Sequence, residues 1–96
     1  QRFSTPAEEY AYELDRNRSY ADLIPIAIAE FKPGNDALRD IQNSMDANRR
    51  LREQAQQEAA KMNHRAALAV LHSATSRLQN ALAAAGLRVP QDPRPE

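Results

Sequence analysis

Two histidines and two methionines are the side chains of this 96-residue sequence that could hold a metal ion or a haem: His64, His72, Met45 and Met62. Imidazole nitrogen and thioether sulfur are ligands of copper and of haem iron. On one helix, His64 and His72 would be two turns apart, about 12 Å along the axis, so they cannot chelate one ion by themselves. Met62 and His64 flank the predicted turn between the last two helices, and with Met45 or His72 from another helix or another chain they could form such a site. The other interpretation is that the methionines fill gaps in the core, that the histidines lie at its boundary, and that no cofactor is bound.

The rest of the sequence offers little that a catalytic mechanism could use. The absence of cysteine excludes disulfides, thiolate metal sites and a thiol nucleophile. Ser73 and Ser76 lie near His72, but no glycine is close enough to form the strained turn that exposes a nucleophilic serine. The sequence contains neither a glycine-rich phosphate loop nor the Glu-x-x-His pairs of di-iron helical bundles. We therefore expect that the protein is not an enzyme.

Acidic residues gather around two tyrosines near the start of the sequence: Glu8, Glu9, Glu13 and Asp15, beside Tyr10 and Tyr12. Such a group can bind a cation or a partner, or it can simply favour the N-terminus of a helix. The ligand spacing and the glycine of an EF-hand loop are absent. Over the whole chain, thirteen basic and thirteen acidic residues are interspersed and cancel. A nucleic-acid-binding protein normally presents a basic face, so we expect no nucleic-acid partner.

Composition and periodicity predict an all-α fold, a small helical bundle of three to four helices built on a long antiparallel helical hairpin. Much of the apolar content is alanine, the best helix former, and only two glycines occur. The bundle is expected over residues 5–86, after an N-terminal tail of residues 1–4 and before a proline-rich flexible tail of residues 87–96. Its helices are expected at about residues 6–16, 20–31, 36–62 and 65–85.

Local signals set the expected ends of these helices. Thr5 can cap a helix that has Pro6 at its first position, and Gly86 can end the last helix. Residues 17–19, with the sequence Asn-Arg-Ser, are interpreted as a break. Asn63 is interpreted as the point at which the chain reverses, so that the two long helices lie antiparallel. The alternative is one continuous helix of about fifty residues, which would need a partner chain to cover its apolar stripe.

The stretch 20–31 is apolar on most of its circumference, which is typical of a helix buried against several neighbours. We expect it to supply most of the core, through Leu23, Ile24, Ile26, Ile28 and Phe31. Pro25 would lie in the first turn of this helix, where a missing N–H costs least. In the long helix that follows, Asn48 falls on the inner stripe. It either fixes the register of the packed helices, or lies where the hairpin is splayed and water reaches it.

These patterns favour a non-catalytic protein that binds a protein partner, or assembles with its own copies, through its helices. A chain of this size has more alanine-lined and apolar helix surface than it can cover, and another subunit commonly covers such surface. The longest apolar run, Leu23 to Ala29, is too short to span a bilayer, so no stable membrane insertion is expected. A sequence that begins at Gln1 and lacks cysteine suits an exported accessory protein, periplasmic or secreted. A cytoplasmic protein, or a fragment, is the alternative.

Overall fold

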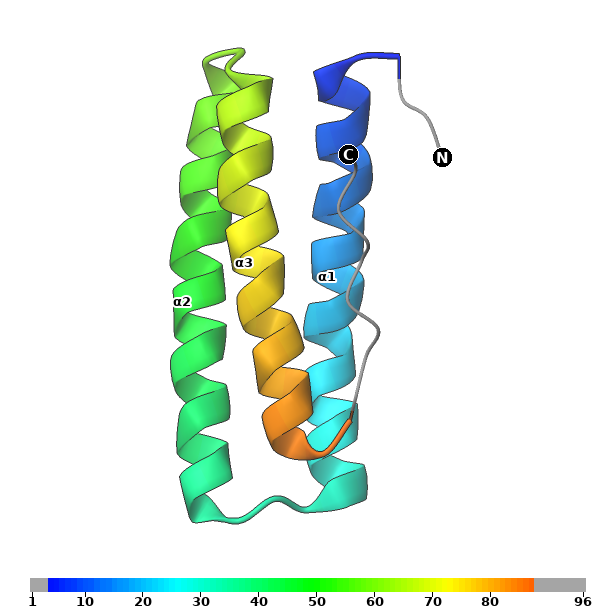
Figure 1. Ribbon diagram of the computed structural model, residues 1–96, viewed down its shortest axis with the longest axis vertical. Coiled ribbons are helices and arrows are strands. Elements are labelled where there is room, and N and C mark those ends of the chain that lie inside the picture. The colour runs from blue at the N-terminus through cyan, green and yellow to red at the C-terminus, as the bar shows by residue number, and fades with distance from the viewer. Residues whose placement is uncertain (1–3, 88–96) are drawn as a thin grey trace.

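The computed structural model describes residues 4–87 and shows three long helices in this range, joined by short connections and antiparallel to their neighbours along the chain (Figure 1). Helix α1 spans Pro6–Phe31, α2 spans Asn35–Ala60 and α3 spans His64–Ala85. No strand occurs among the described residues. The predicted all-α bundle is therefore confirmed. The predicted tail over 87–96 lies, apart from Leu87, outside the described residues, as do residues 1–3.

The start of α1 follows the predicted capping pattern. Thr5 has an extended backbone, and its Oγ1 accepts a hydrogen bond of 3.1 Å from the amide of Glu8. The Glu8 carboxylate in turn accepts a bond of 2.9 Å from the amide of Ser4. Pro6 occupies the first helical position, where its missing N–H has no partner to lose. These contacts satisfy backbone donors that a helix start otherwise leaves open.

The predicted break at residues 17–19 is wrong, because α1 continues through it to Phe31. Asn17 is completely buried, and its side chain bonds to side chains of α2 and α3. Asparagine costs a helix interior about 0.7 kcal/mol relative to alanine, whereas a buried hydrogen bond contributes about 1 kcal/mol. Two bonds to neighbouring helices therefore outweigh the local preference for a turn.

The merger of the two expected helices also moves Pro25, which lies inside α1 and not in a first turn. A proline there cannot donate the usual hydrogen bond to the carbonyl of Ala21. Its side chain is exposed, whereas Ile24 and Ala27 on either side of it are buried. Packing of these neighbours against the rest of the bundle holds the helix across the missing bond.

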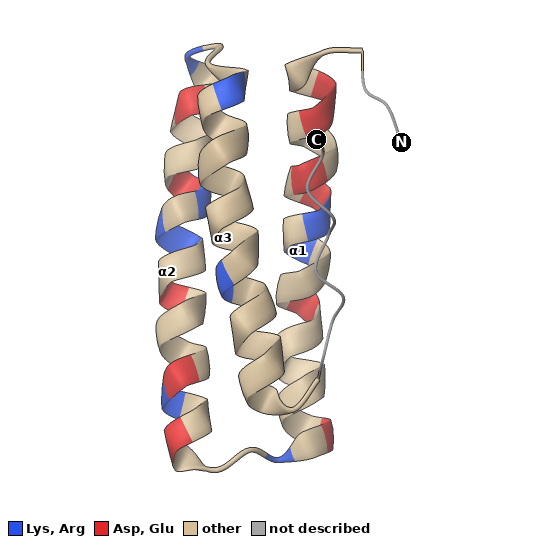
Figure 2. Ribbon diagram, in the orientation of Figure 1, with Lys and Arg blue, Asp and Glu red and all other residues tan. Residues whose placement is uncertain are grey.

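Helix α3 is the centre of the bundle, since both α1 and α2 pack along it (Figure 1). The core forms two groups. The first, towards the α1–α2 connection, contains Ile24, Ala27, Ile41, Leu78, Ala81, Leu82 and Ala85. The second, towards the α2–α3 turn, contains Ala55, Ala67, Leu71 and Ala74. Most of these side chains come from α3, which carries only two Lys, Arg, Asp or Glu residues, Arg65 and Arg77 (Figure 2).

The prediction that residues 20–31 supply most of the core is therefore wrong. Of the five large apolar residues named for it, only Ile24 is fully buried, and Ile28 is partly buried against the first core group. Ile26 is 62% exposed, Phe31 48% and Leu23 36%. The reason is geometric: this stretch packs mainly against one neighbour, α3, which covers a single stripe of it.

The reversal predicted at Asn63 is present, as a tight turn between α2 and α3. The amides of Met62 and Asn63 donate to the carbonyls of Ala59 and Glu58, both at 2.9 Å. Met62 adopts a left-handed conformation, with φ of 67°, at a position where glycine is the usual residue. At the other end of α3, Gly86 has φ of 111° and caps the helix as predicted. No described helix combines the length and the apolarity that crossing a membrane requires.

Candidate functional site

A layer of buried polar side chains crosses the middle of the bundle. Asn17 Nδ2 donates to Asn48 Oδ1 at 2.9 Å and to Thr75 Oγ1 at 3.0 Å. Arg52 Nη1 donates to Asn17 Oδ1 at 3.3 Å. Asn17, Asn48 and Thr75 come from α1, α2 and α3 respectively and are no more than 5% exposed. We call these four residues the polar layer.

The polar layer decides between the two alternatives for Asn48. Its side chain is 4% exposed and hydrogen-bonded to another helix, so Asn48 fixes the register of packed helices. A shift of one helix by a turn would bury its polar group without a partner, at about 1–3 kcal/mol for each group. Neither Asn17 nor Thr75 was predicted to take part in a site. The signal for Asn17 was its place on the inner stripe of α1, three residues from Leu14 and seven from Ile24.

The acidic cluster of α1 does not converge on one point. Glu8 caps the helix, Asp15 is exposed, and Glu13 is buried with only 8% exposure. Glu13 Oε1 accepts a bond of 2.7 Å from Arg16 Nη1, and the Arg16 guanidinium lies over the ring of Tyr20, 5.4 Å from its centroid. In residues 4–87 no three His, Cys, Asp or Glu side chains are grouped so that they could hold a metal ion.

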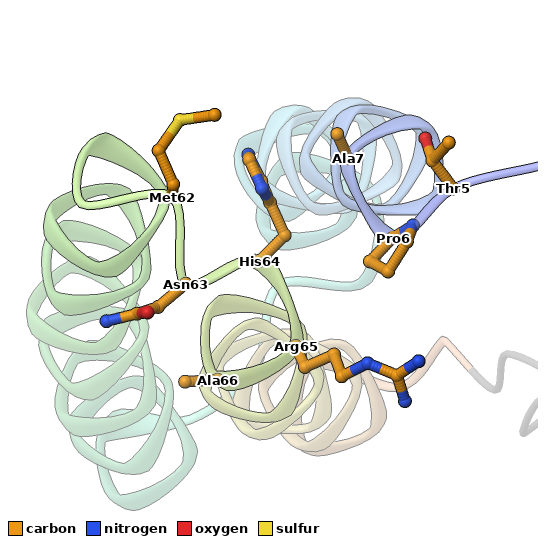
Figure 3. A pocket seen from close by; sticks show the side chains of 8 residues that line it. All are labelled: Thr5, Pro6, Ala7, Met62, Asn63, His64, Arg65 and Ala66. Carbon is orange, nitrogen blue, oxygen red and sulfur yellow. The ribbon is translucent and has the colours of Figure 1, made fainter.

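An open hollow of about 500 Å³ lies between the first residues of α1 and the α2–α3 turn (Figure 3). Its lining residues are Thr5, Pro6, Ala7, Met62, Asn63, His64, Arg65 and Ala66. The His64 ring lies between the turn and α1, with its centroid 5.9 Å from that of Tyr10 and the planes inclined by 59°. Burial raises the pKa of Tyr10 above its ordinary value, and the nearby charge of Arg18 partly opposes this rise.

The four predicted metal ligands are only partly brought together. Met62 and His64 line the same hollow, and Met62 is 77% exposed. His72 is exposed on α3, two turns beyond His64. Met45 packs against the first core group, and it lies 17 residues before Met62, about 25 Å along α2. One molecule therefore offers two of the four side chains at one place.

Large apolar side chains are exposed on the second half of α1. Leu23 and Ile26 are three residues apart, so they are neighbours on one helix face, and Ile26 points away from α3. Phe31 lies at the end of the helix against Gly86: a β-carbon built on that glycine would be 3.4 Å from the Phe31 ring. We call Leu23 and Ile26 the exposed α1 pair.

The fold and these sites define an antiparallel three-helix bundle that is tied together by interhelical hydrogen bonds. Comparison of the chain with protein-family models, with curated proteins and with solved structures finds no match. The interpretation of its function therefore depends on its own geometry.

Proposed function

We propose that this protein is a non-catalytic binding or assembly module that joins a protein partner, or a second copy, through the outer face of α1. The observation that carries the proposal is the 62% exposure of Ile26 beside Leu23 on a helix that a single neighbour covers. The same proposal includes export, as a periplasmic or secreted accessory protein, since a chain without cysteine has no thiol that an oxidising compartment could cross-link.

The exposed α1 pair has the geometry of an anchor for a second helix. Side chains at positions i and i+3 reach into one groove of a facing helix. Complete burial of an isoleucine or leucine side chain contributes about 1.5–3 kcal/mol, so covering the exposed parts of the two contributes roughly 1.5–3 kcal/mol together. This amount is too small to hold two molecules together by itself, so the pair would act as an anchor within a larger contact surface.

The test is a double substitution, Leu23→Gln with Ile26→Gln, and the matched control is Met62→Gln. The control removes an even more exposed apolar side chain, 77% against 62%, from the opposite end of the bundle. We expect the native protein to show a mass that rises with concentration in sedimentation, or a purified partner to bind it. The double variant should lose this association at least tenfold, and the control should keep it.

Two results would contradict the proposal. One is a strict monomer at millimolar concentration that binds no partner from its native source. The other is equal weakening by the double variant and by Met62→Gln, because that result would indicate non-specific adhesion. Far-ultraviolet circular dichroism confirms that each variant retains its helices.

The open hollow, which Met62 and His64 both line, favours a second candidate function. In this alternative the protein is a small copper or haem carrier that uses these two side chains. Two ligands from one molecule would be completed by two from another molecule, since Met45 and His72 lie elsewhere. Titration with Cu(I) under a competing chelator, and a visible spectrum with haem, test this carrier. Binding that survives in Met62→Gln and His64→Gln would exclude the hollow as its site.

A further inference from the structure

The polar layer divides α1 into two halves with different anchors. Beyond the layer, towards Phe31, α1 buries Ile24 completely and Ala27 to 2% exposure. Before the layer, over residues 6–16, the buried side chain is a carboxylate, that of Glu13. The apolar contacts of this half come from Tyr10 and Leu14, which are only partly buried.

The ion pair of Glu13 adds little to the docking of this half. Its 2.7 Å bond joins Glu13 to Arg16 of the same helix, so this bond does not tie α1 to α2 or α3. A carboxylate also regains its hydration in water, which apolar side chains do not. Glu13 is the most buried side chain of residues 6–16. Its exposure to water on undocking therefore costs less than the exposure of a buried apolar side chain would.

The surface opposite this half also contains little fully buried apolar area. The buried members of the second core group are three alanines, Ala55, Ala67 and Ala74, and one large side chain, Leu71, while Leu51 and Val70 pack against them only partly buried. Alanine offers little area to bury, and the gain from burial scales with that area. The open hollow beside Met62 adds no enclosed packing at the end of the helix.

We propose that residues 6–16 form an arm that undocks from α2 and α3 as one unit, and that the polar layer is the boundary where the opening stops. Asn17 holds this boundary because it bonds to all three partners of the layer. Opening breaks the Tyr10–His64 ring contact and uncovers Leu71 and its flanking alanines. The first core group remains closed throughout.

Native-state amide hydrogen exchange, resolved by residue, tests the arm. A segment as short as residues 6–16 does not stay helical in water once it leaves its neighbours, so its amides lose their hydrogen bonds on opening. Amides of residues 10–16 should therefore share one protection factor and one weak dependence on urea. Their protection should be lower than that of residues 20–28 by about a hundredfold or more, with a step between Asn17 and Tyr20. Simple fraying of a helix end would instead give protection that rises smoothly from residue 10.

Two variants change the arm in opposite directions. Leu14→Ala should speed exchange in residues 10–16 about tenfold and leave α3 unchanged. Glu13→Leu should slow exchange in the same residues, since it replaces a buried carboxylate by apolar area. A smooth gradient, equal protection in both halves of α1, a step at Pro25 in place of the polar layer, or faster exchange in Glu13→Leu would each overturn the proposal.

Discussion

Removal of the Asn17 side chain tests the polar layer most directly. The substitution Asn17→Ala deletes the donor of two hydrogen bonds, at 2.9 and 3.0 Å, and the acceptor of a third at 3.3 Å. Asn48 and Thr75 are 4% and 5% exposed, so water does not readily replace the lost partner. Arg52 is only half-buried and can turn to solvent.

The expected magnitude follows from the two groups left without partners. Each buried polar group that loses its hydrogen bond costs about 1–3 kcal/mol, which gives roughly 2–6 kcal/mol for the pair. Alanine returns about 0.7 kcal/mol of helix propensity. We therefore expect the free energy of unfolding to fall by about 1–5 kcal/mol, a large part of the stability of so small a domain.

Urea denaturation followed by circular dichroism at 222 nm measures this change. Asn43→Ala is the matched control, because Asn43 is exposed on α2 and its replacement gives the same gain in propensity. It should raise the free energy of unfolding by no more than about 0.7 kcal/mol. The triple variant Asn17→Leu, Asn48→Leu, Thr75→Val should recover most of the loss, since no polar group is then left unpaired. A loss below about 1 kcal/mol in Asn17→Ala would refute the role given to the layer.

Three further predictions concern single positions. Leu71→Ala removes the one large buried side chain of the second core group and should lower the free energy of unfolding by about 2–5 kcal/mol in the same denaturation experiment. A loss below about 1 kcal/mol would show that neighbouring side chains fill the cavity. Met62→Gly should stabilise the protein by about 0.5–1 kcal/mol, because glycine adopts the left-handed conformation without strain; destabilisation would contradict this. The raised pKa of Tyr10 means that the folded state keeps its phenol proton at a pH where the unfolded chain has lost it. Stability from this group is therefore complete below the ordinary tyrosine pKa and is lost as pH rises through the folded value. Tyr10→Phe should reduce the loss of stability above pH 10 and should leave the stability near neutral pH unchanged. Identical alkaline unfolding of the two proteins would refute this prediction.

The features that local sequence determines were predictable. The Thr5 cap, the Gly86 cap and the reversal at Asn63 each depend on a few adjacent residues, and the structure contains all three. The break predicted at Asn17 was wrong because it, too, was inferred from adjacent residues alone. Asparagine prefers turns when only its neighbours in sequence are considered, and its partners Asn48 and Thr75 lie 31 and 58 residues away.

The number of neighbours of a helix is a second property that local sequence does not contain. The residues around Ile26 are apolar on several faces, which fits a helix in the middle of a bundle. The structure gives the central place to α3, whose alanines allow close approach from two sides. Ile26 is then 62% exposed, and the pattern that predicted a core helix belongs to a helix that α3 covers along one stripe.

The central position of the last helix has a consequence for biosynthesis. A ribosome releases α1 and α2 first, yet each of them packs chiefly against α3. The apolar stripes of α1 and α2 therefore lack most of their partner surface until residues 64–85 have left the exit tunnel. Nascent chains arrested before this point should remain sensitive to protease, and folding should follow completion of α3 in a single late step.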